Sequence, residues 1–369
     1  MRSLALAILC LLALAPAASA AKRSVPQGFF GAVYDGELRT APDEVQDRQW
    51  DLMARSGVES VRVMFSWDEA QPDPDEPPSF EITDQHVERA VRRRIRILPV
   101  VIYAPAWARK DPQLYNSPPR RTDDYTEYLK AIMARYGRRG SFWREHPDLP
   151  KRPLRELQIW NEPQLRYQWN DDEYLRGYSA LLRDSYRTIK RIDRRTRVVL
   201  AGLTNDSWRA LEELYDRGDS GGNFDAVGLA PFTASAGGVI RILKLARRVM
   251  RRHGDTRMPL WVTELSWPAS KGRIKSRSPL QTTERGKAKR LARAYRLLAR
   301  HRRDRRVRVS RAYWYTWSSS YEDQVFRFSG LQRFDGDRFR RNPAYWAYVR
   351  AARKYEGCRK TETGRCRRR

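Results

Sequence analysis

The chain has 369 residues, of which 41% are hydrophobic, enough for one large core. This length would permit two domains, but no Gly/Ser- or Pro-rich linker interrupts its middle, so we expect one main domain at residues 21–353. The formal net charge is +29, from 73 Lys and Arg against 44 Asp and Glu.

This positive charge has two interpretations. It could attract an anionic polymer, such as nucleic acid or an acidic polysaccharide, or a membrane surface. It could also be the solvated face of Arg-rich helices, which is the interpretation we favour. The basic residues are spread over many predicted helices and no recognition fold is visible, so we predict no nucleic-acid partner.

The first 20 residues have the pattern of a signal peptide. Arg2 precedes an apolar run at residues 4–15, and Ala18-Ser19-Ala20 is typical of a cleavage site. The run is too short to span a bilayer, and no other membrane segment is visible. Cys10 follows a Leu rather than a small residue, which argues against a lipoprotein. We therefore predict a secreted protein cleaved near Ala20.

Strand and helix patterns alternate along the rest of the chain, which predicts an α/β fold with a parallel sheet covered by helices. We count eight strands, each followed by a helix or a long connection, so the predicted fold is a single (β/α)8 TIM barrel. The strands are expected at residues 28–33, 58–65, 95–103, 154–160, 198–203, 226–232, 260–267 and 311–317. The helices are expected at residues 43–56, 83–94 with Thr83 as cap, 122–136, 171–192, 239–253 and 284–302, and from Asn342-Pro343 onward.

Long connections follow four of these strands, at residues 68–79, 105–121, 270–283 and 318–337. In this fold the loops after the strands build the active-site face. We therefore expect a walled cleft at that end of the barrel.

The basic tail at residues 354–369 receives no predicted fold. It contains Cys358 and Cys366, which in an exported protein are typical of a disulfide. The alternative is a tail whose thiols are incidental.

Two strand ends carry a glutamate in an apolar context. Ile159-Trp160-Asn161-Glu162-Pro163 ends the fourth strand, and Glu264 lies within the seventh-strand sequence at residues 260–267. Either glutamate alone could be a solvated loop residue. Together they are the two carboxylates that glycosidic bond hydrolysis requires, one to protonate the leaving oxygen and one to attack the sugar.

These motifs resemble those of retaining glycoside hydrolases of clan A. The residues around the two glutamates are most similar to those of bacterial family 39 and family 5 enzymes. The resemblance implies that Glu162 is the acid/base, Glu264 is the nucleophile and Asn161 binds the sugar 2-hydroxyl. It also implies that Arg62, within the second strand, pairs with Glu264. The expected substrate is a β-linked oligo- or polysaccharide.

The resemblance further implies a tryptophan sugar platform at the end of the eighth strand, at Trp314 or Trp317. Trp67, Trp107, Trp169 and Trp267 also fall at strand ends or on the following loops. Aromatic faces stack on sugars, so we expect substrate contacts from Trp314, Trp317, Trp67 and Trp267. For any one of them, core or loop packing is an equal alternative.

The chain departs from the clan at the sixth strand, where Ala230-Pro231-Phe232 replaces a His-x-Tyr-like sequence. This leaves open a catalytically impaired barrel that binds a carbohydrate or an anionic envelope polymer. The four histidines lie away from the strand ends, and no metal-ligand spacing or phosphate-binding glycine loop is visible. We predict no metal, no cofactor and a monomer.

Overall fold

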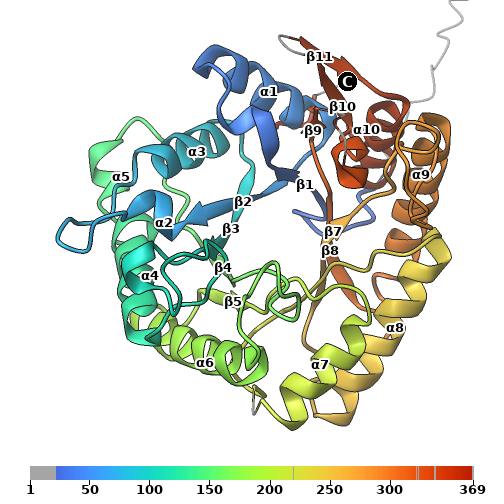
Figure 1. The fold of residues 1–369 in the computed structure, drawn as a ribbon. Coiled ribbons are helices and arrows are strands. Elements are labelled where there is room, and N and C mark those ends of the chain that lie inside the picture. Colours follow the sequence, from blue (N-terminus) through green and yellow to red (C-terminus); the bar gives the residue numbers. More distant parts are fainter. Residues whose placement is uncertain (1–21, 219, 321, 323, 336–337, 368–369) are drawn as a thin grey trace, which may run out of the picture.

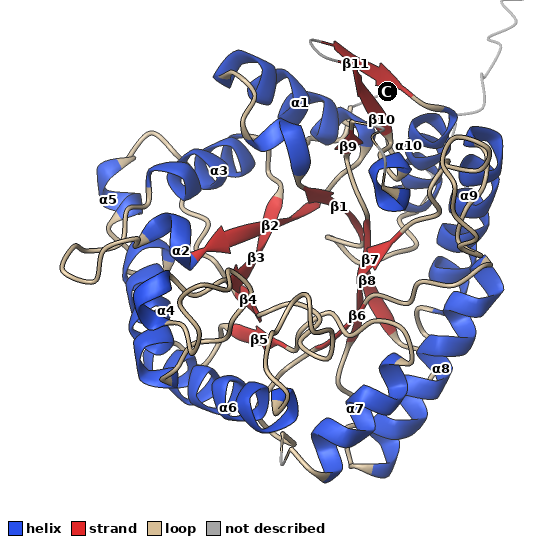
Figure 2. Ribbon diagram, in the orientation of Figure 1, coloured by secondary structure: helices blue, strands red, loops and turns tan. Residues whose placement is uncertain are grey.

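A computed structural model describes residues 22–218, 220–320, 322, 324–335 and 338–367. Eight parallel strands form one sheet in the order β5-β4-β3-β2-β1-β8-β7-β6 (Figures 1 and 2). Parallel bridges from Val199 to Ala226 and from Leu203 to Leu229 join its two edges. The predicted (β/α)8 barrel is therefore confirmed. The predicted signal peptide lies outside the described residues.

The barrel strands are short and buried. They are β1 (Phe30–Tyr34), β2 (Ser60–Ser66), β3 (Arg96–Ile102), β4 (Glu156–Ile159), β5 (Arg197–Val199), β6 (Val227–Leu229), β7 (Leu260–Leu265) and β8 (Val309–Trp314). The helices that surround them are α1 (Asp43–Ser56), α2 (Trp67–Ala70), α3 (Glu81–Arg92), α4 (Thr122–Tyr136), α5 (Phe142–Glu145), α6 (Tyr174–Ile192), α7 (Ser207–Asp216), α8 (Ala236–Arg252), α9 (Glu284–His301) and α10 (Pro343–Glu356).

The core has two layers, as side-chain alternation along the strands requires. One layer fills the barrel and the other lies between the sheet and the helices. The inner layer consists of Val33, Leu98, Val199, Ala226, Trp261 and Tyr313. Because helices cover the sheet, most strand residues are buried on both faces, which explains the near-continuous apolar runs in the sequence.

Two local predictions need correction. Thr83 does not begin its helix, because α3 starts at Glu81 and the Thr83 hydroxyl donates to the carbonyl of Phe80 at 3.1 Å. Helix α7 was not predicted, since its ten residues lie in what the sequence pattern presented as a connection.

The connection after β8 is more ordered than expected. It contains the strands β9 (Ser318–Ser319) and β10 (Gln332–Asp335), which form a small sheet with β11 (Arg338–Arg341). This sheet lies beside α10, next to the mouth of the barrel (Figure 1).

The C-terminal segment packs beneath the barrel. Helix α10 begins at Asn342-Pro343, as predicted, and continues past residue 353 to Glu356. The predicted disulfide between Cys358 and Cys366 is present, with Cα atoms 5.6 Å apart. Lys360, inside its loop, is buried against Glu59 and Glu356. Across residues 22–367, no described helix is long and apolar enough to cross a membrane.

Candidate active site

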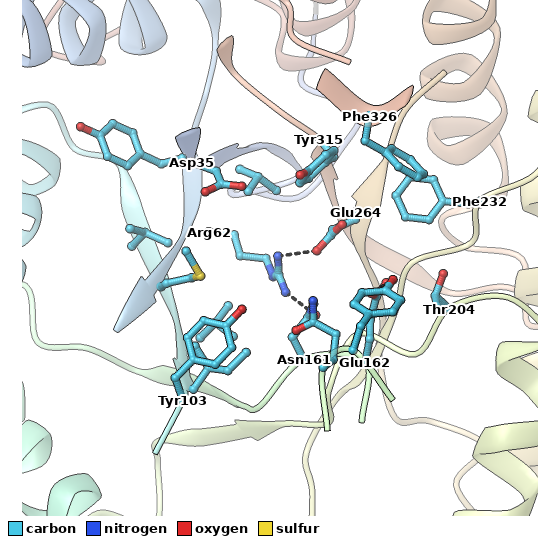
Figure 3. Close-up of a pocket in the computed structure, with 18 of the residues that line it drawn as sticks. Asp35, Arg62, Tyr103, Asn161, Glu162, Thr204, Phe232, Glu264, Tyr315 and Phe326 are labelled. Carbon is cyan, nitrogen blue, oxygen red and sulfur yellow. Dashed lines mark hydrogen bonds and ion pairs between the residues drawn. The ribbon is translucent and has the colours of Figure 1, made fainter. Parts of the chain in front are cut away.

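The carboxyl ends of the strands surround a cavity of about 540 Å³. Glu162 follows β4 and Glu264 lies in β7, and both side chains line this cavity although both residues are more than nine-tenths buried. Figure 3 shows the two carboxyl groups facing the same space, with Arg62 beside them. The structure therefore brings together the two glutamates that the sequence singled out.

Arg62 in β2 connects three groups at the floor of this cavity. Its Nη1 donates to Oε1 of Glu264 at 2.8 Å, and its Nη2 donates to Oδ1 of Asn161 at 2.7 Å. Its Nε donates to Oε1 of Gln158 at 2.9 Å. A buried guanidinium needs such partners, and here they hold it in one orientation. The predicted contact between Arg62 and Glu264 is present.

The chain turns sharply where β4 ends. Trp160 and Glu162 have φ values of 62° and 42°, a region that non-glycine residues rarely adopt. This turn places Asn161 and Glu162 at the cavity although they are adjacent in sequence. The amide oxygen of Asn161 accepts from Arg62, which leaves its NH2 group to donate to a bound molecule.

The two glutamates differ in their electrostatic surroundings. Burial, followed by the negative charge of Glu264, raises the pKa of Glu162 from 4.5 to about 8. Burial also raises the pKa of Glu264, but the guanidinium of Arg62 in direct contact opposes that rise. Glu162 has no ion pair with a described residue, so it is the carboxyl that holds a proton at neutral pH.

The four tryptophans expected to contact substrate do not line the cavity. Trp67, Trp267, Trp314 and Trp317 are fully buried. Each indole N–H donates within the protein, to Gln71, Thr233, Ser329 and Gln49 respectively. The predicted tryptophan platform is therefore wrong for these residues.

The physical reason is clearest for β8. Side chains alternate along a strand, and Tyr313 points into the barrel, so Trp314 points outward to the helices. The aromatic residue from this strand end that reaches the cavity is Tyr315. Of the other two tryptophans considered, Trp169 is buried and Trp107 donates to the carbonyl of Gln71, and neither lines the cavity.

Several cavity residues were missed in the sequence. Asp35 and Tyr103 come directly after β1 and β3, and Tyr315 follows β8. Tyr167 reaches in from the loop after β4, and its hydroxyl lies 3.4 Å from Oε2 of Glu162. The first three occupy strand ends, where this fold collects functional side chains, so the position itself was the available signal.

Phe232, the residue at the departure from the clan pattern, does line the cavity. Its ring packs against Phe326 with centroids 5.0 Å apart (Figure 3). The ring of Tyr315 also packs against Phe326, and burial, followed by the negative charges of Asp35, Glu264 and Glu162, raises the pKa of its hydroxyl. Tyrosines from the β4 and β8 loops thus supply hydroxyl groups at a site where the β6 loop supplies none.

The described part of the chain contains no cluster of three or more His, Cys, Asp or Glu residues that could hold a metal ion. His86, one of the four histidines, lies away from the cavity. It is buried beside Tyr34, with ring centroids 5.1 Å apart, and burial lowers its pKa to about 3. It is a neutral packing residue.

Several solved structures with a similar fold are glycoside hydrolases. The shared fold is the (β/α)8 barrel. A family 39 glycoside hydrolase from Bacteroides cellulosilyticus WH2 superposes with a TM-score of 0.67 at 18% identity, covering 90% of this chain and 64% of its own. A monomeric β-xylosidase from Caulobacter crescentus CB15 gives 0.65 at 19% identity, covering 89% of this chain and 69% of its own.

A family 5 enzyme, GH5_18 from Streptomyces cattleya solved with GlcNAc, also gives a TM-score of 0.65. It is 17% identical and covers 90% of this chain and 81% of its own. No protein-family model and no curated protein matches the chain. These similarities establish a shared fold, and this chain spans about two thirds of the length of the family 39 hydrolase.

Proposed function

We propose that this protein is a secreted glycosidase that hydrolyses β-linked oligo- or polysaccharides by a retaining mechanism with two carboxylates. The observation that carries the proposal is that two buried carboxyl groups in one cavity have different electrostatic surroundings. Glu264 is in contact with Arg62, whereas Glu162 has a pKa of about 8. Paired carboxyl groups in unlike environments are the arrangement that acid catalysis and nucleophilic attack require.

In the first step, Glu162 gives its proton to the glycosidic oxygen while the Glu264 carboxylate attacks the anomeric carbon. The bond to the leaving group breaks, and a glycosyl ester forms on Glu264. The NH2 group of Asn161, oriented by Arg62, donates to the sugar 2-hydroxyl. In the second step, Glu162 accepts a proton from water, which attacks the anomeric carbon and releases Glu264. Retention requires the two carboxyl groups to lie about 5–5.5 Å apart.

Export is part of the proposal. It rests on the signal-peptide pattern at residues 1–20, and the Cys358–Cys366 disulfide is consistent with it, since such bonds persist in oxidising compartments. We further propose that the enzyme works as a monomer and without a metal or cofactor. Exhaustive chelation should leave activity unchanged, and activity restored by one added metal would contradict this.

The test is a screen of chromogenic aryl β-glycosides and of plant and bacterial polysaccharides. With any active substrate, proton NMR of the first product should show retention of the anomeric configuration. Inversion would instead require the carboxyl groups to stand about 6.5–9.5 Å apart, with water between them, and would overturn the mechanism.

Phe232 supports a second candidate, a barrel that binds a carbohydrate or an anionic envelope polymer without cleaving it. It lacks the hydroxyl that the resemblance places beside the nucleophile. This candidate predicts saturable binding of a saccharide with no turnover, equal for the wild type and for Glu264→Ala. Turnover lost in Glu264→Ala would exclude it.

A further inference from the structure

A second hollow of about 790 Å³ lies beside the catalytic cavity. The two share Asn205 and Phe232, which form part of the lining of both. The hollow is lined by the first residues of α7 and α8, two helices that lie side by side (Figure 1). Because helices in this barrel begin at the carboxyl ends of the strands, the hollow opens on the same face as the catalytic cavity.

Trp208, near the start of α7, lines this hollow and is only partly buried. Its indole N–H makes no hydrogen bond with the described residues. Of the twelve tryptophans, Trp208 and Trp346 are the two whose N–H neither bonds to a described residue nor belongs to the buried groups without a partner. The indole N–H groups that are bonded belong to Trp67, Trp107, Trp143, Trp160, Trp267, Trp314 and Trp317.

Polar residues share the lining of this hollow with Trp208. Asn205, Asp206 and Arg241 line the hollow, and the Asp206 and Arg241 side chains make no ion pair with a described residue. The space beside Gly237 is open, since a Cβ there would meet nothing closer than the Ser235 hydroxyl at 3.8 Å. An aromatic ring with an open N–H, among hydroxyl, amide and charged groups, matches the alternating apolar and hydroxyl faces of a sugar.

The side of the cavity on which the hollow lies identifies which part of a substrate would enter it. Figure 3 shows Thr204, the residue before Asn205, beside Glu162, and Asp35 and Tyr103 on the opposite side of the cavity. A proton donor must face the oxygen of the leaving group. Since Glu162 is that donor in the proposed function, the leaving group lies toward Asn205 and Phe232, and therefore toward Trp208.

We infer that this hollow is a leaving-group subsite, which binds the saccharide released in the first step and stacks one of its sugars on Trp208. The inference rests on the proposed function and deepens it. The substrates are glycans whose leaving group is itself a saccharide chain, rather than small glycosides of non-sugar alcohols.

The experiment compares two substrates with the same reacting sugar, an oligosaccharide and an aryl monoglycoside. In Trp208→Ala, the ratio of kcat/KM for the oligosaccharide to that for the aryl glycoside should fall about tenfold, since only the oligosaccharide loses a stacking partner. Trp208→Phe should recover most of this ratio. Trp346→Ala is the matched control, because Trp346 is the other open indole and lies on α10, and it should change neither rate.

Hydrolysis of the aryl glycoside by each variant shows that it is folded. An unchanged ratio in Trp208→Ala would overturn the subsite and leave the glycosidase proposal intact. A wild-type protein that cleaves neither substrate nor any glycan in the screen would overturn the proposed function, and the subsite with it.

Discussion

A buried glutamate lies near each end of strand β4, and the two glutamates differ in whether a cation contacts them. Glu156, at its start, contacts Arg311 through both carboxylate oxygens, and the Arg311 guanidinium also lies over the ring of Trp261 at 4.2 Å. Glu162, just past its end, has no cation in direct contact among the described residues. Burial is similar at the two positions, so the counter-charge is what separates them.

The base of the barrel repeats this pairing. Glu59 contacts Arg23 and Lys360, and Lys360 also contacts Glu356 at 3.0 Å. The pKa of Glu356 is nevertheless raised to about 8 by burial, with Lys360 opposing the rise. Buried acids at the base thus anchor strands and the C-terminal tail, whereas Glu162, a buried acid at the mouth with no cation in contact among the described residues, is available for proton transfer.

Removing the acids at the mouth should have the largest effect. Glu264→Ala should abolish turnover of every substrate, because no glycosyl ester can form. Glu162→Ala should lower kcat by about 10²–10⁴ for poor leaving groups and far less for activated aryl glycosides, which need no proton. Steady-state kinetics of both variants check this, with the exposed Glu362→Ala as control. Equal losses on both substrate classes would contradict the assignment of Glu162.

Breaking the pair at the base should change stability instead. Arg311→Met removes the cation that contacts both oxygens of the buried Glu156 carboxylate and leaves only Arg197, 3.8 Å away, which should cost about 3–5 kcal/mol in the free energy of unfolding. Urea denaturation measures this loss, and kcat at low temperature should stay near the wild-type value. A large loss of kcat in folded protein would show that the two ends are coupled.

Glu162→Gln should stabilise the protein in a defined pH range. Below about pH 4.5 the carboxyl is protonated in both the folded and the unfolded state. As the pH rises toward 8 the unfolded state releases this proton first, so the wild type loses stability that the glutamine variant keeps. The gain should grow to a few kcal/mol, at roughly 1.4 kcal/mol per pKa unit, and level off above pH 8. Denaturation series from pH 4 to 9 would show it, and a difference independent of pH would contradict it.

A smaller effect concerns the charge of the substrate. Among the described residues, the charged side chains that line the cavity are Asp35, Glu162, Glu264 and Arg62, and Arg62 is already paired with Glu264. Aryl β-glucuronides should therefore react more slowly than the matching glucosides, despite the net charge of +29. Asp35→Asn should improve the glucuronide relative to the glucoside by roughly fivefold, as removal of one nearby charge allows. A glucuronide preferred by the wild type would contradict this account.

The fold and the centre of the site could be predicted from the sequence. Parallel strands bring their carboxyl ends to one edge, so Arg62, the adjacent pair Asn161 and Glu162, and Glu264 meet although they come from three strands that are distant in sequence. Their roles in catalysis stay predictions, as do secretion and the monomeric state. The disulfide prediction is confirmed.

The aromatic residues could not be assigned in the same way. Tyr313, Trp314, Tyr315 and Trp317 are all large and apolar, so no alternation of polarity shows which side chains point into the barrel. Helix α7 was equally hidden, because a short helix in a long connection gives little periodicity to detect. As a result, no pattern in the sequence predicts Trp208 near the substrate. The structure places it in the hollow beside the cavity that holds Glu162 and Glu264.

The most direct test of the account is a titration of the Glu162 carboxyl, which needs no substrate. Carbon-13 NMR of protein labelled at the glutamate carboxyl carbons, compared with Glu162→Gln, identifies the signal. We predict that it titrates with a pKa of about 8 in the wild type and that the pKa falls in Glu264→Gln, where the neighbouring negative charge is gone. A Glu162 carboxyl that titrates near 4.5 in the folded protein would contradict its role as the proton donor.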